Sequence, residues 1–255
     1  MLSTSRQAAR LGFGLGLGLE SEPVLDARGV VKAYGGLRPF RLRELRVARG
    51  EVVALSGPDA AQASVLVDLL TGATLPDEGE VVVRGRSTRA IEGHEDWLAF
   101  LEGFGLVGER VVLLQGLTVA QNLAIPLTLS VDPMEPSVRQ SVERLAVEAG
   151  LSPGLLDSPL SQAGAAVRAR IRLGRAVAHD PSVLLLEHPT AGLERPEAEA
   201  YGSDVRRLAA RRGLAALLVT ADAALAREAT RALEWRAATG QLSRAGGRLR
   251  RLLGS

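Results

Sequence analysis

A turn between a predicted strand and a predicted helix has the frame of a phosphate-binding loop. The apolar residues 51–55 predict a buried strand, the Ser-Gly-Pro-Asp sequence at 56–59 predicts a turn, and residues 64–70 predict a helix. Phosphate-binding loops with the pattern G-x-x-x-x-G-K-[ST] join a strand to a helix in this way. When the pattern is aligned here, Gly57 takes the first position and Ser64 the last, where a hydroxyl group can contact Mg²⁺.

Two residues that supply most of the chemistry of such a loop are replaced. Gln62 stands at the second glycine position and Ala63 at the lysine position. Glycine lets the backbone amides approach a phosphate closely, and lysine adds a positive charge to that contact. The chain has one lysine, Lys32, which lies upstream of the loop. The sequence therefore leaves two interpretations open, a weak phosphate site or a purely structural strand, turn and helix.

The composition of the 255-residue chain argues against several other kinds of site. The sequence pI is about 9.6, but the formal net charge is only +2 and nearly all cations are arginines, so we do not predict nucleic-acid binding. There are no cysteines, and the three histidines are not spaced as a ligand set. No apolar run is long enough to span a bilayer and no signal peptide is expected, so the default location is the cytoplasm.

The order of the remaining elements predicts an α/β protein. Strands that alternate with helices indicate a mostly parallel sheet covered on both faces, and three strands around the loop indicate a small antiparallel sheet. We expect a Gly-rich tail at 1–22, one domain at 23–242 and a basic tail at 243–255. The predicted strands are 24–32, 42–49, one within 76–86, 183–186 and 214–220, and the predicted helices begin near 120 and cover 136–150, 167–178, 197–212 and 223–232.

Several segments resemble the nucleotide-binding subunits of ATP-binding cassette (ABC) transporters, in that family's order and over roughly residues 24–242. They are AYGG, GEVVALSGPD, LTGATLPDEGEVVVRG, LTVAQNLAIPL, HDPSVLLLEHPTAGLE and LLVTAD. The resemblance implies a P-loop NTPase-type three-layer core with an antiparallel β subdomain and a helical subdomain. It also implies that two such domains pair head to tail around ATP and Mg²⁺, and that their closure drives an integral membrane permease.

The resemblance assigns binding roles to individual positions. Tyr34 falls where the family stacks the adenine ring. The other implied ATP-binding positions are Gly57, Ala63, Ser64, Val65, Glu109 and Glu187, and the implied Mg²⁺ ligands are Ser64, Glu109 and Glu187. Glu109 replaces a glutamine that reaches Mg²⁺ and senses the permease, and Gln115 is the alternative alignment for that glutamine.

The positions that the family uses for hydrolysis are eroded. His188 replaces the glutamate that polarises the attacking water, and Ala221 replaces the histidine that contacts the γ-phosphate. The LSGGQ signature falls on either 163–167 or 160–164, and neither alignment keeps both glycines. No catalytic residue is therefore assigned, and Glu109, His188 and Ala221 are degenerate positions.

These observations predict a catalytically degenerate ABC subunit with weak or lost binding of ATP and Mg²⁺. It would act as a regulatory or structural partner of a permease or of a competent ATPase, in a homodimer or heterodimer, on the cytoplasmic face of the membrane. Two alternatives stay open. One is an active ATPase that uses Glu109, Glu187 and His188 as substitutes, and the other is a soluble binding module without a transport role.

Overall fold

The computed structural model describes residues 22–245, and these residues form two sheets and seven α-helices. The larger sheet has the strand order β10-β9-β3-β8-β7-β6. Its strands β3, β6, β7, β8 and β9 pair in parallel, and β10 pairs with β9 in antiparallel orientation. The strands are β3 (Val52–Ser56), β6 (Phe104–Val107), β7 (Val183–Glu187), β8 (Ala215–Val219), β9 (Arg231–Arg236) and β10 (Gln241–Arg244).

The smaller sheet is antiparallel and has the order β2-β1-β4-β5. Its strands are β1 (Leu25–Lys32), β2 (Phe40–Val47), β4 (Glu78–Val83) and β5 (Arg86–Ser87). In β2 the buried and exposed residues largely alternate, as the sequence predicts for a strand with one covered face. The predicted antiparallel subdomain is therefore confirmed.

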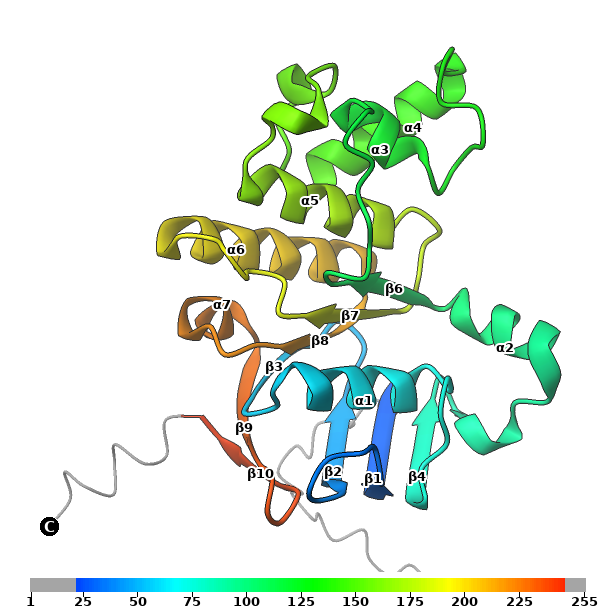
Figure 1. Cartoon of the computed structure of the whole chain (residues 1–255), viewed down its shortest axis with the longest axis vertical. Coiled ribbons are helices and arrows are strands. Elements are labelled where there is room, and N and C mark those ends of the chain that lie inside the picture. Colours follow the sequence, from blue (N-terminus) through cyan, green and yellow to red (C-terminus); the bar gives the residue numbers. More distant parts are fainter. Residues whose placement is uncertain (1–21, 246–255) are drawn as a thin grey trace, which may run out of the picture.

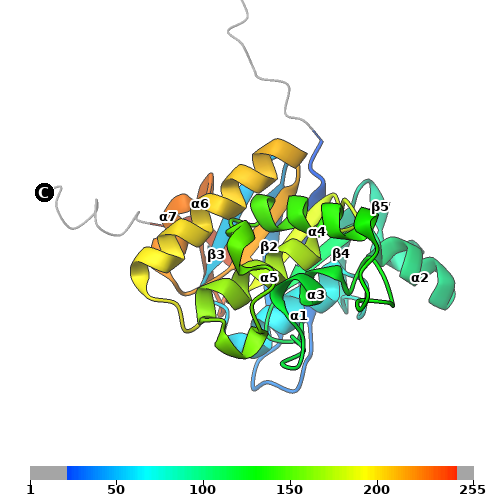
Figure 2. The same cartoon turned by 90° about the horizontal axis from the view of Figure 1, so that it is seen from above.

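The helices form layers around these sheets (Figure 1). Helix α1 lies between the two sheets, α5 and α6 cover the opposite face of the larger sheet, and α3 and α4 lie beyond α5. Seen from above, α2 and α7 lie on opposite sides of the molecule (Figure 2). The helices are α1 (Ala60–Leu70), α2 (Gly93–Leu101), α3 (Val119–Ala124), α4 (Pro136–Glu148), α5 (Ala165–Ala176), α6 (Arg195–Arg212) and α7 (Ala223–Glu228).

Three groups of buried side chains hold these layers together. The first lies around α1 between the sheets, the second joins the larger sheet to α5 and α6, and the third lies among α3, α4 and α5. Burial of these side chains is the main force that joins the layers. The result is the three-layer core with an antiparallel subdomain and a helical subdomain that the sequence predicts.

The C-terminal end of the fold differs from the sequence prediction. Helix α7 ends at Glu228 rather than at residue 232, and the chain then forms β9. Pairing of β9 with β3 and burial of Leu233 and Trp235 override the helical preference of this alanine-rich segment. Strand β10 ends at Arg244, so it crosses the predicted boundary at residue 242. The predicted tails lie mostly outside the described residues.

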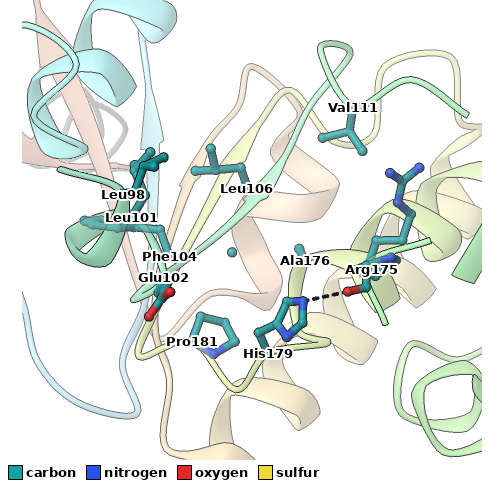
Figure 3. A pocket seen from close by; sticks show the side chains of 12 residues that line it. Leu98, Leu101, Glu102, Phe104, Leu106, Val111, Arg175, Ala176, His179 and Pro181 are labelled. Carbon is teal, nitrogen blue, oxygen red and sulfur yellow. Dashed lines mark hydrogen bonds between the residues drawn. The ribbon is translucent and has the colours of Figure 1, made fainter. Parts of the chain in front are cut away.

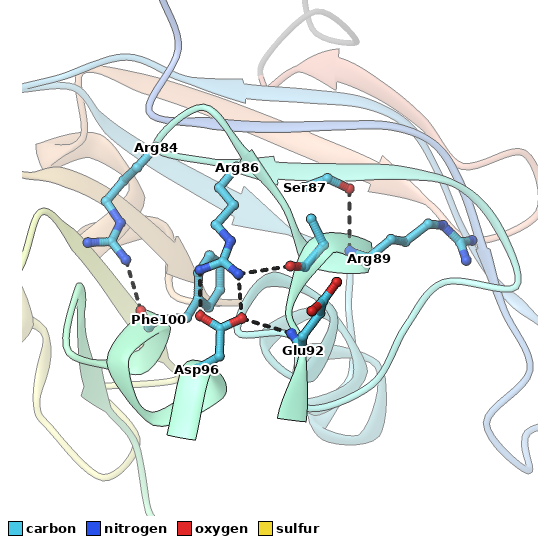
Figure 4. Close-up of polar contacts among 8 residues, drawn as sticks. Arg84, Arg86, Ser87, Arg89, Glu92, Asp96 and Phe100 are labelled. Carbon is cyan, nitrogen blue, oxygen red and sulfur yellow. Dashed lines mark hydrogen bonds and ion pairs between the residues drawn. The ribbon is translucent and has the colours of Figure 1, made fainter. Parts of the chain in front are cut away.

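Helix α2 is fixed to the end of the antiparallel sheet by arginine side chains (Figure 4). Arg86 donates two hydrogen bonds to the Asp96 carboxylate, which also accepts one from the Glu92 N–H at 2.8 Å. These bonds lower the pKa of Asp96 to about 2. Arg84 donates to the Phe100 carbonyl at 2.9 Å, with its guanidinium 5.6 Å from the Phe100 ring centroid. Polar contacts thus position a helix whose first turn is largely exposed.

A buried ion pair joins α5 to α6 and gives the first prediction. Nη2 of Arg170 lies 2.8 Å from Oδ2 of Asp204, and the two side chains are 13% and 6% exposed. Replacement Asp204→Ala should lower the free energy of unfolding by about 3 kcal/mol, because it leaves the Arg170 charge buried without its partner. Urea denaturation followed by circular dichroism measures this loss.

The chain offers a matched control on the same carboxylate. Arg207 also contacts Asp204, but its side chain is 60% exposed. Arg207→Ala should therefore cost less than about 1 kcal/mol. Equal losses for the two variants would contradict the importance of burial at this pair.

Candidate functional site

The turn after β3 closes with a capping box at the start of α1. The Gln62 N–H donates to Oδ1 of Asp59 at 2.8 Å, and the Asp59 N–H donates to Oε1 of Gln62 at 3.0 Å. Asp is a preferred N-cap residue, and Gln three positions later completes the box. Helix α1 consequently begins at Ala60, four residues before the predicted start at Ser64.

At this helix start, backbone N–H groups that a phosphate loop would direct at its ligand already donate hydrogen bonds within the protein. The Gln62 amide is bonded to Asp59, and the Ala63 N–H donates to the Asp59 carbonyl at 2.8 Å. The Asp59 carboxylate also places a negative charge at the positive end of the helix dipole. An entering phosphate would have to displace this carboxylate and would be repelled by its charge.

Tyr34 lies beside the same turn. Nε2 of Gln62 donates to the Tyr34 hydroxyl at 3.3 Å. The Tyr34 ring lies over Gly36, where an added Cβ atom would be 2.7 Å from the ring. The residue expected to stack on adenine is thus hydrogen-bonded to the residue that replaces the second glycine.

Gly57 is required by the packing of the turn against β9. Its φ is +111°, and a Cβ atom there would lie 2.5 Å from the Trp235 carbonyl oxygen. Both features exclude a side chain without backbone movement. The first glycine of the motif therefore has a structural reason to be present, whether or not a phosphate binds.

The Ser64 hydroxyl, the expected Mg²⁺ ligand on α1, is occupied by a side chain. Nη2 of Arg110 donates to Oγ of Ser64, and Nη1 donates to Oδ1 of Asp68 at 3.3 Å. Glu109, the second expected ligand, is exposed, and its side chain makes no hydrogen bond or ion pair within residues 22–245. The structure therefore brings Arg110 to Ser64 in place of Glu109.

Mg²⁺ does not fit the groups present here. Mg²⁺ prefers several oxygen ligands in a near-octahedral arrangement. The described part of the chain has no group of three or more His, Cys, Asp or Glu side chains suited to a metal ion. A guanidinium on Ser64 also repels a second cation. Among the expected Mg²⁺ ligands, Ser64 is bonded to Arg110, and Glu109 is exposed without a polar contact in the described residues.

Glu187 ends β7 and is half-buried. Burial raises the pKa of its carboxyl group, while the nearby Arg110 charge opposes that rise. Replacement Arg110→Ala should thus raise the pKa of Glu187 further, because it removes a stabilising cation from the carboxylate. Carbon-13 NMR titration of the glutamate carboxyl groups measures the change. A fall in this pKa, or no change, would show that Arg110 does not act on Glu187.

His188 follows Glu187 in a left-handed backbone conformation, with φ at +42°. Its N–H donates to the Val219 carbonyl at 2.8 Å, which fixes the backbone. Nε2 of its ring is buried and has no hydrogen-bond partner in the described structure. Ala221, just after β8, is exposed and has no polar side chain. Neither position presents an oriented acid or base.

Comparison with known proteins identifies the family. The family model described as "ABC transporter" matches residues 42–191, which is more than half of the chain. The chain belongs to the ABC transporter family. The ATP-binding protein LolD of a lipoprotein-releasing system in Alcanivorax borkumensis is 30% identical over 206 residues, which cover 79% of this chain and 90% of LolD.

Other ABC proteins match at similar identity. The methionine import ATP-binding protein MetN of Brucella abortus is 29% identical over 201 residues, which cover 78% of this chain but 53% of MetN. The chain thus spans about half the length of MetN. The dimeric ABC transporter cassette MJ0796 has a TM-score of 0.70 at 21% identity, covering 88% of this chain and 99% of that cassette. That structural likeness supports the ABC cassette fold.

One of the two alignments of the ABC signature falls at the start of α5. Helix α5 begins at Ala165, with Gly164 as its N-cap and no side-chain cap, so the alignment on 163–167 coincides with a helix start. Arg168 donates to the carbonyls of Ala163 and Leu160, both at 2.9 Å. Arg168 also donates to Oε1 of Gln115 at 3.1 Å. Gln115, the alternative alignment for the glutamine that the family uses to reach Mg²⁺, is therefore in contact with α5.

A cavity of about 760 Å³ lies between α2, β6 and α5, away from the capped turn (Figure 3). Its lining is mixed, with the apolar side chains Leu98, Leu106 and Val111 and the basic side chains Arg175 and His179. The His179 ring is bonded to the Pro126 carbonyl at 2.8 Å. No helix within residues 22–245 is long and apolar enough to cross a membrane.

Proposed function

We propose that this chain is a nucleotide-binding-cassette subunit of an ABC transporter that no longer hydrolyses ATP. It acts as a structural or regulatory partner of a membrane permease or of a competent ATPase subunit. The observation that carries the proposal is that two groups of the site, at the turn and on α1, are already bonded to side chains of the chain itself. The Asp59 carboxylate holds the Gln62 N–H, and Arg110 holds the Ser64 hydroxyl.

The missing charges support the absence of hydrolysis. Phosphoryl transfer depends on positioned charge more than on covalent help from the protein. Each lost electrostatic contact typically costs about 2–4 kcal/mol of transition-state stabilisation, although losses within one site are not additive. Ala63, His188 and Ala221 stand at three such positions. His188 also lacks a partner that could orient it as a base.

The same contacts weaken binding of ATP and Mg²⁺ in this proposal. An incoming phosphate meets the Asp59 carboxylate, and an incoming metal ion meets the Arg110 guanidinium. Tyr34 is hydrogen-bonded to the turn and would need to leave it to stack on a base. Binding must therefore break existing contacts before new ones form, which lowers the net affinity.

The cavity beside β6 supports a protein partner. Its rim includes the exposed apolar side chains Leu98 and Leu106, and it adjoins Val111 in the loop after β6. Apolar side chains gathered at an open cavity favour protein contact. We propose that a permease segment lies here, which would place this cassette at the cytoplasmic face of the membrane. In this proposal the cassette comprises residues 23–245.

The test is co-expression of the chain with a candidate ABC permease subunit. We expect the two proteins to co-purify and phosphate release to equal the buffer background. Replacement His188→Ala should leave that background unchanged. ATP-dependent phosphate release that His188→Ala abolishes would overturn the proposal in favour of an active ATPase.

A lone chain that never co-purifies with a membrane subunit or a second ATPase would contradict the partner role. The control is a complex that carries Leu98→Asp and Leu106→Asp, which place charges on the cavity rim. We expect these changes to reduce co-purification without unfolding the chain, because both side chains are exposed.

A further inference from the structure

The loop after β6 is attached to the core on two sides. Residues Gly108 to Val111 form a turn closed by the Val111 N–H on the Gly108 carbonyl at 3.2 Å. On one side, Arg110 reaches Ser64 and Asp68 of α1. On the other side, α5 holds the backbone, and these two attachments place the loop between α1 and α5.

The attachment to α5 is made by two arginines. Nε of Arg172 donates to the Val111 carbonyl at 3.1 Å, and Nη1 of Arg175 donates to the Val112 carbonyl at 2.9 Å. Hydrogen bonds from a charged donor are stronger than neutral ones. The loop that follows Arg110 is thus bound to the helical subdomain independently of Arg110.

The attachment to α1 depends on one guanidinium. Arg110 bonds the Ser64 hydroxyl and the Asp68 carboxylate, and its charge also acts on Glu187 at the end of β7. Gly108 lies against Glu187, since a Cβ atom there would be 3.3 Å from Cβ of Glu187. One positive charge therefore bonds two oxygen-bearing groups on α1, in a loop whose Gly108 lies against Glu187 of β7.

We infer that the guanidinium of Arg110 is a built-in substitute for a divalent cation. It holds the loop 108–112 against α1 in one position with no nucleotide or metal present. The Ser64 hydroxyl and the Asp68 carboxylate on α1 are then both bonded to this loop. The connection between the core and the helical subdomain is consequently fixed by the protein itself.

This inference rests on the proposed function in one respect, namely that Mg-ATP is not needed to position the loop. Different measurements nevertheless overturn the inference and the proposed function. Phosphate release would overturn the proposed function, whereas the position of the loop is measured by amide hydrogen exchange. A chain that hydrolyses ATP with an unchanged loop would keep the inference and lose the proposed function.

The experiment is hydrogen–deuterium exchange of the full chain, followed by mass spectrometry of peptides that cover residues 108–114. The samples are the unmodified chain with and without excess Mg-ATP, and the variant Arg110→Ala. Arg195→Ala is the matched control, because Arg195 is an exposed arginine that pairs with Glu199 within a single helix. Peptides from β3 and α6 report whether each variant is folded.

We expect exchange of the loop in the unmodified chain to be the same with and without Mg-ATP. Arg110→Ala should speed this exchange about tenfold. The hydrogen bonds that Arg110 donates are charged but exposed, so their contribution to the stability of the loop is at the low end of the range for charged hydrogen bonds. Arg195→Ala should leave the loop unchanged. If Arg110→Ala does not fold, Ser64→Ala removes the acceptor instead and should act in the same direction.

Two results would overturn the inference. One is exchange in the unmodified chain that Mg-ATP slows several-fold, which would mean that a ligand positions the loop. The other is a folded Arg110→Ala or Ser64→Ala variant whose loop exchanges like that of the unmodified chain. In that case the α5 arginines alone would hold the loop.

Discussion

Replacement of Gln62 by Gly together with Ala63 by Lys should raise the affinity for ATP about 100-fold, because it removes the side-chain contacts of Gln62 from the turn and adds a positive charge. Removing the Gln62 side chain breaks the capping box with Asp59 and the bond to Tyr34. The Asp59 N–H then becomes available to a phosphate, while the N–H of residue 62 keeps its bond to the Asp59 carboxylate until a phosphate displaces it. The new ammonium group adds a charge-assisted hydrogen bond. Isothermal titration calorimetry with ATP measures the change.

The matched control for the charge is Gln62→Gly with Ala63→Met. Methionine has a similar length but no charge, and Ala63 is fully buried, so both variants meet the same packing constraint. The lysine variant should bind ATP at least about tenfold more tightly than the methionine variant. Equal affinities would show that the charge at residue 63 is not what binding lacks. Neither variant should hydrolyse ATP, since residues 188 and 221 are unchanged.

Replacement Gly57→Ala should lower the free energy of unfolding by about 3 kcal/mol, because it combines backbone strain with a steric clash. A φ of +111° is costly for any residue with a side chain. The new methyl group would also overlap the Trp235 carbonyl oxygen, so β9 or the turn would have to move. Guanidinium denaturation measures the loss.

Gly50→Ala separates strain from clash. Gly50 has a φ of +74° and no atom within 4 Å of an added Cβ, so its replacement should cost only about 1 kcal/mol. A Gly57→Ala variant as stable as Gly50→Ala would mean that packing against β9 is unimportant. In that case the glycine of the motif would have no structural role at this turn.

Much of the fold could be predicted because strands and helices leave regular patterns. The buried runs of β3, β7 and β8 and the alternation in β2 are visible in the sequence. The first two residues of β9 were wrongly predicted as the end of a helix, and the rest of this strand was not predicted. Its conformation depends on pairing with β3, which lies far away along the chain, and on burial of Trp235. Such contacts are absent from local patterns.

The site was predictable only where its residues follow one another in the chain. Gly57, Ala63 and Ser64 lie where the motif placed them. The capping box was also readable, as an Asp followed by Gln three residues later, although the helix was predicted to start at Ser64. Arg110 could not be foreseen, because its bond to Ser64 joins residues 46 positions apart. Spacing instead pointed to its neighbour Glu109.

In the proposed function, the chain's own side chains occupy the phosphate and metal positions of this ABC cassette. Calorimetric titration of the purified chain with ATP, in buffer containing Mg²⁺ and again in EDTA, tests it most directly. We expect no saturation up to about 1 mM ATP and the same weak signal in both buffers. Saturation near 1 μM that disappears on addition of EDTA would contradict the claim, since an empty, functional nucleotide site behaves in that way.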